Sequence, residues 1–237
     1  MIKPLRLFGA NIKSKTNKLP LEISGTDFLR PIIYNENIGS AQVKSCIILC
    51  ALNTPGTTVI NSKISRNHTE LMLNFLNYPI NVKKNKNFDK IEVKGLHQFK
   101  AFNYNVPGDI SSASFFIVLT LLSNKSKIVI KNVNINHTRI GIITILNKMG
   151  AGIKLKEKRF YNGEEIADIH VRSRKKLKSV NCPSRLNSSA IDEFLIIFLA
   201  AAKAKGVSKF KDLEEMNKKE SKRLNLAIKF LQLIGIK

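Results

Sequence analysis

Apolar residues recur at helical spacing in three segments that each begin with a Ser-Ala pair. The serines are Ser40 in "IGSAQVKSCIILCAL", Ser112 in "VPGDISSASFF" and Ser189 in "NSSAIDEFLIIFLAA". A serine hydroxyl can accept a hydrogen bond from a free N–H group of a first helical turn. The pattern therefore predicts three helices, each starting within a residue or two of its serine, and it indicates a repeated structural unit before any chemistry.

A short β-prone run and a second apolar helix follow each of these segments. The runs are "TTVIN" at Thr57, "KIVIKN" at Lys127 and "VSKF" at Val207, and the second helices are "SRNHTELMLNFLNY", "INHTRIGIITILNKMG" and "KKESKRLNLAIKFLQLIG". Alternating patterns predict strand pairs, "YPINVKK" with "KIEVKG" and "GAGIKLKEK" with "ADIHVRS". Each unit thus reads helix, strand, helix, strand, strand, which makes this an α/β chain built from supersecondary repeats.

The two ends of the chain interrupt this repeat. "MIKPLRLFGANIKSK" is typical of the end of a second helix, because its Gly9 matches Gly150, and "LQLIGIK" stops where the earlier unit continues into a strand pair. We therefore expect the chain to be the middle of something longer. Pro107 and Gly108 break the chain between elements, so we expect two lobes, residues 1–106 and 107–237, that meet near residue 107.

Length and composition favour a globular protein with a real core. The longest uncharged apolar runs, such as 194–202, are too short to cross a bilayer, and the N-terminus carries no charged-apolar-small cleavage pattern. We expect a soluble, cytoplasmic protein.

Cys46, Cys50 and Cys182 form an odd set without histidines at metal-ligand spacing, so core thiols are favoured over a metal site.

The net charge of +23 allows three interpretations: nucleic-acid binding, small anionic substrates, or a lysine-rich solvated surface. The lysines gather in loops such as "KSKTNK" and "RSRKKLK" instead of one stripe. No combination of aromatic and basic residues typical of an RNA-binding sheet accompanies them. Solvated surface explains most of the charge, while a few cations at helix starts could still bind phosphate.

Several polar residues at helix starts are candidates for binding anions. Ser40, Ala41 and Gln42 open a helix, where a phosphate would meet free N–H groups and the positive end of the helix dipole, but Ser40 is equally well explained as a simple cap. Arg66 could hold a phosphate or carboxylate through two hydrogen bonds, or be a surface arginine. His68 and His137 occupy matching helix starts, where capping is the favoured role.

Acidic candidates lie in the last third of the chain. Asp192 is expected one turn into an otherwise apolar helix with Glu193 beside it; an acid there needs a purpose, although a first helical turn also favours acids electrostatically. The charges of "KKESKR" by themselves indicate a solvated helix start. We interpret Asp109 and the serines that follow it structurally, with "VPGD" as a hinge and the serines as helix caps.

Five blocks, in order and at sensible spacing, together resemble the enolpyruvyl transferases, and among them the EPSP synthases (3-phosphoshikimate 1-carboxyvinyltransferases). The blocks are "GSAQVKS" (39–45), "SRNHTELML" (65–73), "PGDISSASFF" (107–116), "IDEF" (191–194) and "KKESKR" (218–223). The resemblance implies repeated βαβαββ units that form two inside-out α/β barrel-like lobes, both incomplete here. It also implies transfer of the enolpyruvyl group from phosphoenolpyruvate to a hydroxyl of shikimate 3-phosphate, with release of phosphate.

The resemblance also assigns roles to individual residues. Asp192 is the base that takes the hydroxyl proton, Glu193 is its less essential neighbour, and Glu220 takes part in proton transfer. The residues implied to bind substrate are Ser40, Ala41, Gln42, Arg66, Lys219 and Arg223. The implied protein is a monomer of the shikimate pathway that needs no cofactor or metal and binds neither nucleic acid nor membrane.

The chain departs from the family pattern in two respects. Lys222 stands where the family has an acid, and Asn217 where it usually has an arginine. In addition, the Lys-Ser, Arg-Pro and C-terminal arginine segments that bind the substrates elsewhere in the family have no counterpart here, so we expect the chain alone to be inactive. The rival hypotheses are a UDP-N-acetylglucosamine enolpyruvyl transferase and a non-catalytic polyanion-binding protein.

Overall fold

A computed structural model describes residues 1–174, 176–218 and 221–236 of the chain. The chain divides into two units, Met1–Tyr104 and Asn105–Lys237, and each has its own apolar core. The mixture of helices with parallel and antiparallel strands confirms the α/β fold class. Whether the lobes correspond to the expected domains of an enolpyruvyl transferase stays a prediction.

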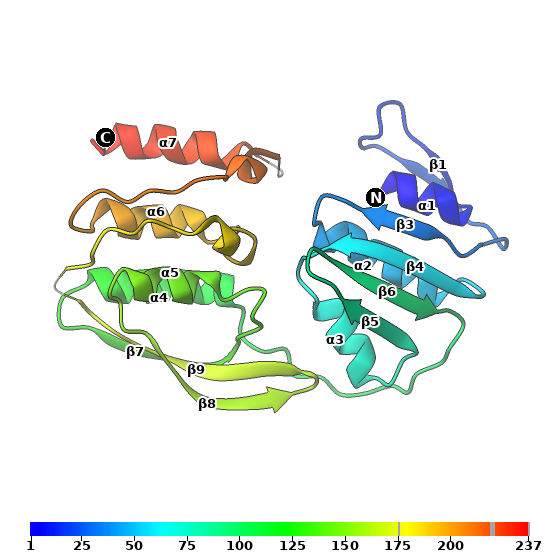
Figure 1. Ribbon diagram of the computed structural model, residues 1–237, viewed down its shortest axis with the longest axis horizontal. Coiled ribbons are helices and arrows are strands. Elements are labelled where there is room, and N and C mark those ends of the chain that lie inside the picture. The colour runs from blue at the N-terminus through cyan, green and yellow to red at the C-terminus, as the bar shows by residue number, and fades with distance from the viewer. Residues whose placement is uncertain (175, 219–220, 237) are drawn as a thin grey trace. The chain divides into compact units, whose positions relative to one another are not determined.

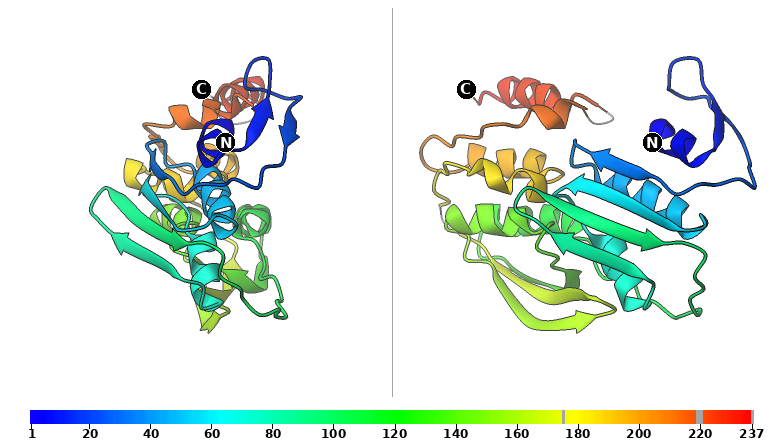
Figure 2. Two further views of the ribbon diagram at one scale, coloured as in Figure 1. Left: turned by 90° about the vertical axis from the view of Figure 1, so that its right-hand side faces the viewer. Right: turned by 45° about the vertical axis from the view of Figure 1, so that its right-hand side comes forward.

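Unit 1 is a four-stranded sheet with its helices on one face (Figures 1 and 2). Strand β3 runs parallel to β4, the remaining pairs are antiparallel, and the strand order is β3-β4-β6-β5. A separate antiparallel pair, β1-β2, follows α1. The elements are α1 (Ile2–Phe8), β1 (Asn11–Lys13), β2 (Glu22–Ser24), β3 (Ile33–Glu36), α2 (Ala41–Leu52), β4 (Thr57–Lys63), α3 (His68–Phe75), β5 (Ile80–Lys84) and β6 (Phe88–Lys94).

The core of unit 1 follows from two periodicities that meet at the sheet. Every second residue of β4 and β6 is buried, as in a sheet with one covered face. Helix α2 turns Ile47, Ile48 and Ala51 toward that face, where they pack with Ile60 and Ile91. In sequence order, β3-α2-β4-α3-β5-β6 is one complete βαβαββ unit.

Unit 2 has a three-stranded antiparallel sheet, β7-β9-β8, with helices stacked on one side of it (Figure 1). Helix α4 contacts β7 and β9, α6 packs on α4 and α5, and α7 packs on α6. The elements are α4 (Ile110–Leu122), β7 (Lys127–Asn134), α5 (Gly141–Lys148), β8 (Lys154–Tyr161), β9 (Glu164–Arg172), η1 (Ser184–Leu186), η2 (Ser188–Ala190), α6 (Phe194–Ala202), η3 (Glu214–Lys218) and α7 (Arg223–Leu233).

The second helix of each repeat ends in the same way. After α1, α3, α5 and α7 the chain enters the left-handed region at Gly9, Asn77, Gly150 and Gly235, with φ of 111°, 54°, 85° and 80°. At each end, this residue's N–H donates to a carbonyl three residues back and the next N–H to one five residues back. These paired bonds satisfy the last carbonyls of a helix, and glycine or asparagine suits the backbone angle. The match between Gly9 and Gly150 is confirmed, and it extends to two further helices.

A parallel strand-helix-strand connection also recurs. In unit 1 it is β3-α2-β4, and in unit 2 an isolated parallel bridge joins Gly108 to Val133 across α4. Around α6, two bridges join Lys178 to Lys205 and Asn181 to Lys209. The strand predicted at Val207 is therefore wrong: the described residues there form bridges without a continuous ladder.

The Ser-Ala pairs mark helix starts less regularly than predicted. Ser40 is the N-cap of α2, and Ser112 lies in the first turn of α4, as expected. Ser189 lies instead in η2, and α6 starts only at Phe194. The prediction that places Asp192 inside this helix is wrong as well, because Asp192 lies in the turn before it.

None of the helices in the described parts of the chain is long and apolar enough to cross a membrane.

Candidate functional site

In unit 1 the candidate residues lie where two helices start. Helix α2 follows β3 and α3 follows β4, and these two strands are parallel, so both helices start at the carboxyl ends of the strands. Free N–H groups and the positive ends of two helix dipoles therefore gather at one edge of the sheet, which favours bound anions. Ser40, Gln42 and Arg66 all lie at this edge.

The turn that leads into α2 is shaped by Glu36. Its buried carboxylate accepts hydrogen bonds from the N–H groups of Ile38 (3.0 Å) and Gly39 (2.8 Å). The Ser40 hydroxyl then accepts from the Val43 N–H at 3.3 Å, so it caps the helix. Gln42 is exposed and Ala41 half-buried, which leaves this helix start accessible to solvent.

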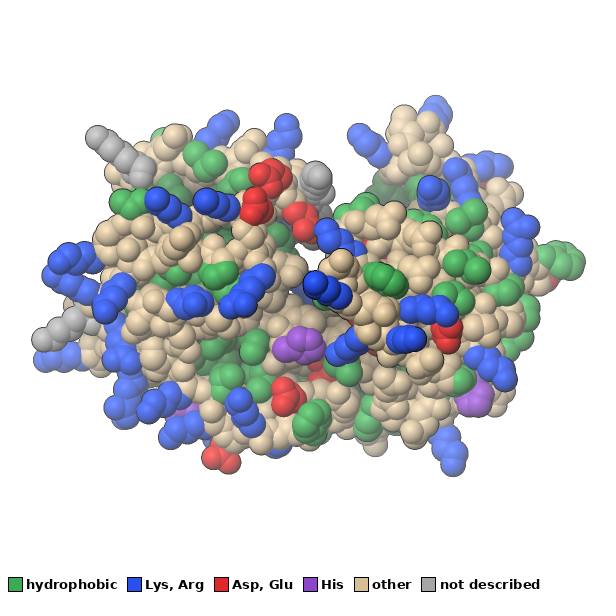
Figure 3. All heavy atoms as spheres, viewed as in Figure 1, with side chains coloured by type: hydrophobic (Ala, Val, Ile, Leu, Met, Phe, Trp, Pro, Cys, Tyr) green, Lys and Arg blue, Asp and Glu red, His purple; other side chains and the backbone are tan. Residues whose placement is uncertain are grey.

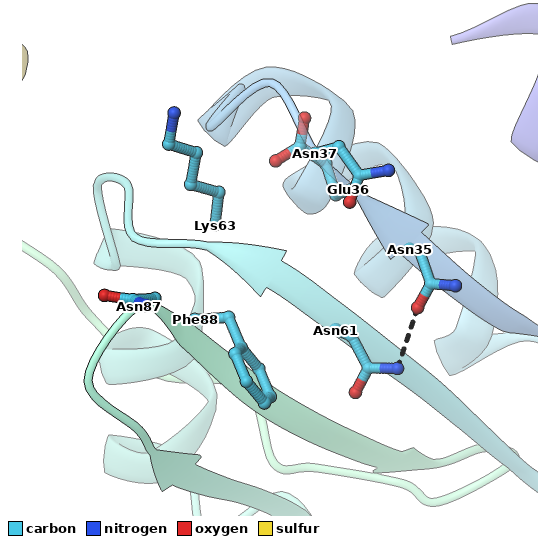
Figure 4. Close-up of a pocket in the computed structure, with 7 residues that line it drawn as sticks. All are labelled: Asn35, Glu36, Asn37, Asn61, Lys63, Asn87 and Phe88. Carbon is cyan, nitrogen blue, oxygen red and sulfur yellow. Dashed lines mark hydrogen bonds between the residues drawn. The ribbon is translucent and has the colours of Figure 1, made fainter.

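A shallow, open pocket of about 610 Å³ lies near the carboxyl ends of β3 and β4 (Figure 4). The Asn61 side chain donates to Asn35 at 2.9 Å on its floor, and Lys63 supplies a cation at the strand end. Its lining residues are Asn35, Glu36, Asn37, Asn61, Lys63, Asn87 and Phe88. None of the sequence-predicted site residues lines it, so this pocket is not the predicted site.

A buried ion pair joins the two helices of unit 1. Lys44 Nζ lies 2.6 Å from Glu70 Oε1, and both side chains are almost fully buried. Beside it, the hydroxyls of Ser45 and Thr69 are 2.7 Å apart. The sequence analysis missed this pair, although a lysine in the apolar stripe of Ile47 and Ile48 was a usable signal.

In unit 2, Asp192 and Arg223 come together. Arg223 Nη1 donates to Asp192 Oδ1 at 3.0 Å, and both side chains are about a quarter exposed. Arg223 is the first residue of α7, and Asp192 lies in the turn before α6. A partly exposed carboxylate held by a guanidinium is fixed in orientation and remains reachable by a ligand hydroxyl.

A second polar group joins the starts of α4 and α6. Arg139 Nη2 donates to Asp109 Oδ1 (2.9 Å) and to Ser111 Oγ (2.6 Å), and the Ser111 hydroxyl donates to Glu193, whose side chain is buried. The prediction that the serines cap α4 is wrong. The N-cap is Asp109, whose carboxylate accepts a hydrogen bond from the N–H of Ser112 at 3.0 Å. The sequence analysis did not single out Arg139.

The electrostatic environment of Asp109 reflects these contacts. Partial burial acts to raise its pKa, but the Ser112 N–H bond and the charge of Arg139 outweigh burial, so the pKa of Asp109 lies below its ordinary value. Burial raises the pKa of the thiols of Cys46, Cys50 and Cys182, as expected of unreactive thiols. The expectation of core thiols is confirmed for Cys182 alone, because Cys46 and Cys50 are half-buried on α2.

Two of the candidate residues, Lys219 and Glu220, lie outside the described residues. Within residues 1–174, 176–218 and 221–236, no cluster of three or more His, Cys, Asp or Glu is placed to hold a metal ion. The remaining candidates divide between the units: Ser40, Ala41, Gln42 and Arg66 belong to unit 1, and Asp192 and Arg223 to unit 2.

Comparison with protein families gives one match over the whole chain. Residues 1–237 match the model described as EPSP synthase (3-phosphoshikimate 1-carboxyvinyltransferase). The relatives include a 3-phosphoshikimate 1-carboxyvinyltransferase of Ruthia magnifica, 44% identical over 100% of this chain and 54% of that protein. Another, from Legionella pneumophila strain Paris, is 38% identical over 99% of this chain and 53% of that protein.

Solved structures agree with these relatives. An EPSP synthase from Acinetobacter baumannii superimposes with a TM-score of 0.85 at 38% identity, over 100% of this chain and 53% of that one. The enolpyruvyl transferase NikO from Streptomyces tendae has a TM-score of 0.62 at 14% identity, over 86% of this chain and 49% of that one, and shows the shared fold alone. The chain thus spans about half the length of the relatives it matches.

Proposed function

Because the chain belongs to the EPSP synthase family, we propose that it supplies part of a site that transfers the enolpyruvyl group from phosphoenolpyruvate to a hydroxyl of shikimate 3-phosphate. The observation that carries the proposal is the Asp192–Arg223 pair, at 3.0 Å, in a chain whose whole length matches this family. These residues come from separate matching blocks, "IDEF" and "KKESKR", and they meet in unit 2. The proposed protein is a cytoplasmic monomer.

The chemistry sets demands that the proposed residues can meet. Two phosphates and two carboxylates must be held together, which requires cations and helix starts. We assign Ser40, Ala41, Gln42 and Arg66 to this task in unit 1, and Arg223 with Lys219 in unit 2. Asp192 takes the proton of the attacking hydroxyl, and Glu220 moves the proton at the enol carbon.

A polyanion-binding protein is the second candidate function for a chain with a net charge of +23. On the visible face, Lys and Arg side chains occur over both units and are most crowded along the left-hand edge of Figure 3. A nucleic-acid-binding surface would concentrate them on one face or along one helix. A polyanion-binding protein would also lose affinity steeply as salt is raised, without preference for shikimate 3-phosphate.

The test is release of inorganic phosphate from shikimate 3-phosphate plus phosphoenolpyruvate, measured for two proteins. One is the chain alone; the other is a chimera in which the chain replaces the matching segment of the Ruthia magnifica relative. We expect phosphate release from the chimera that depends on both substrates, and none from the chain alone, because oriented anion-binding groups supply much of the barrier reduction. A folded but inactive chimera would contradict the proposal. Turnover by the chain alone would support it but overturn the expected need for the remaining groups.

A further inference from the structure

We propose that Glu193 is a positioning residue for Asp192, and that the start of α4 holds it in place through Ser111 and Arg139. The inference rests on the proposed function, in which Asp192 is the base. The contacts themselves are features of unit 2 and can be tested without turnover.

The side chain of Glu193 is held by two consecutive hydrogen bonds, from Arg139 to Ser111 and from Ser111 to Glu193. Glu193 is 2% exposed, and its Oε1 accepts from the Ser111 hydroxyl. A hydroxyl donates one hydrogen bond and accepts others. The Ser111 oxygen therefore also accepts from Arg139 Nη2, at 2.6 Å. A buried carboxylate is costly unless it is hydrogen-bonded, so the bond from Ser111 favours this position of the Glu193 side chain.

Arg139 lies in the turn before α5, and its side chain is held by residues at the start of α4. Its Nη2 donates to Asp109 Oδ1 at 2.9 Å, and Asp109 caps the helix through the Ser112 N–H. Asp109 and Ser111 therefore position the guanidinium, and the Ser111 hydroxyl, which the guanidinium bonds, in turn positions Glu193. The first turn of α4 thus fixes the position of Glu193, and α4 itself is held by its buried face, which packs into the core.

The backbone around Glu193 transmits this position to Asp192. The Glu193 N–H donates to the Ala190 carbonyl and its own carbonyl accepts from the Ile197 N–H, both at 3.0 Å. The turn is also pinned at its other end, because a methyl group added at Gly141 would lie 2.8 Å from the carbonyl carbon of Ser189 and 2.9 Å from Ala190 Cβ. The turn between these two anchors has little freedom to shift.

Adjacent acids in this turn have separate tasks. Glu193 points into the unit toward Ser111, whereas Asp192 is half-buried and meets Arg223 at 3.0 Å at the start of α7. A polar connection therefore runs from α4 through the turn to α7. Loss of the Ser111 hydroxyl should displace Asp192 relative to Arg223, although neither residue touches Ser111 in the contacts described above.

The test compares three serine variants of the full chain by NMR. Ser111→Ala removes the hydroxyl that bonds Glu193; Ser111→Thr keeps a hydroxyl there; Ser112→Ala removes a hydroxyl one residue along, whose partner is Asp109 at 3.2 Å. The signals to follow are the side-chain carboxyl ¹³C of Asp192 and the guanidinium ¹⁵N of Arg223. We expect both to move in Ser111→Ala and to stay within a line width of the parent in Ser111→Thr and Ser112→Ala.

Equal spectra for Ser111→Ala and Ser112→Ala, with the rest of unit 2 unchanged, would overturn the proposal. If Ser111→Ala does not fold, Glu193→Gln provides the same comparison, because it keeps the shape of the side chain and removes the charge that the Ser111 hydroxyl bonds. In the chimera, Ser111→Ala should lower kcat about tenfold and leave KM nearly unchanged. A turnover rate insensitive to Asp192→Asn would instead remove the proposed base and leave the NMR result standing, so the two failures can be told apart.

Discussion

The ammonium of Lys44 lies 2.6 Å from the carboxylate of Glu70, with both side chains buried between α2 and α3. These are the helices whose starts carry Ser40 and Arg66, so the ion pair ties together the two helix starts that we propose bind anions. Within the described residues, the second oxygen of Glu70 has no hydrogen-bond partner, which leaves the lysine as the main compensation for its charge.

We predict that Lys44→Met strongly destabilises unit 1. Removing one partner of a buried pair leaves an uncompensated charge and typically costs about 3–5 kcal/mol. The free energy of unfolding can be measured by urea titration followed through NMR signals of unit 1. The double variant Lys44→Met with Glu70→Leu should recover much of the loss, because an apolar pair of similar volume needs no compensation.

An exposed ion pair of the same unit provides the control. Lys13 and Glu22 are 3.3 Å apart with side chains 68% and 67% exposed, so Lys13→Met should cost less than about 1 kcal/mol. Equal costs for Lys44→Met and Lys13→Met would show that the buried pair does not stabilise the arrangement of α2 and α3.

Two substitutions of Ser40 should separate its capping role from its proposed role in binding. Glycine is nearly as good an N-cap as serine, whereas alanine costs about 1 kcal/mol. Ser40→Gly should therefore leave stability almost unchanged but raise the KM of the chimera for shikimate 3-phosphate about tenfold, since a hydrogen bond to a charged group is lost. An unchanged KM in Ser40→Gly would make Ser40 a cap and nothing more.

Asp109 should give the chain part of its acid sensitivity. Its pKa is lower in the folded chain than the ordinary value of 3.8, so its contribution to stability is present above that value and lost as the pH falls through the folded pKa. Asp109→Asn keeps a capping side chain but removes the titration, and stability below about pH 4 should then fall less steeply with falling pH. Identical acid slopes for the two proteins would contradict this assignment.

Gly141 should be intolerant of a side chain. The methyl group of Gly141→Ala would press on the backbone of Ser189, which cannot rotate away, so we expect a loss of about 1–3 kcal/mol. Gly108→Ala is the matched control in the same unit, because the nearest atoms there lie at 3.5 Å, an ordinary contact. Similar thermal stabilities for the two variants would contradict the close packing of α5 against η2.

The parts of the fold that the sequence predicted are those set by local pattern. The strand pairs β5-β6 and β8-β9 follow from alternation, and the helix ends at Gly9 and Gly150 follow from a backbone angle that glycine adopts freely. Residues 188–193 behave differently. Their serines and acids are typical of a helix start, but Glu193 and Asp192 bond to Ser111 and Arg223, far away in sequence, and α6 begins only after them.

The sequence indicated which residues belong to the candidate site better than it indicated which partners those residues contact. The family resemblance of the blocks "IDEF" and "KKESKR" indicated Asp192 and Arg223, and the structure pairs them. The roles of Arg139 and Glu70 depend on partners contributed by other helices, and no local pattern specifies those partners. Lys44 carried a usable signal, because a charged residue in a continuous apolar stripe requires a buried counter-ion.

The central claim is that Asp192 acts as the base of an enolpyruvyl transfer, and phosphate release by the chimera tests it most directly. Asp192→Asn preserves the size of the side chain but cannot take up a proton, so we expect kcat to fall by about 10²–10⁴ with the chimera still folded. The matched control is Asp168→Asn in β9. Within the described residues, this carboxylate accepts a single hydrogen bond, from the N–H of Asn132 at 2.9 Å, so kcat should stay within about twofold. Equal rates of phosphate release from the Asp192→Asn chimera and the parent chimera would contradict the account.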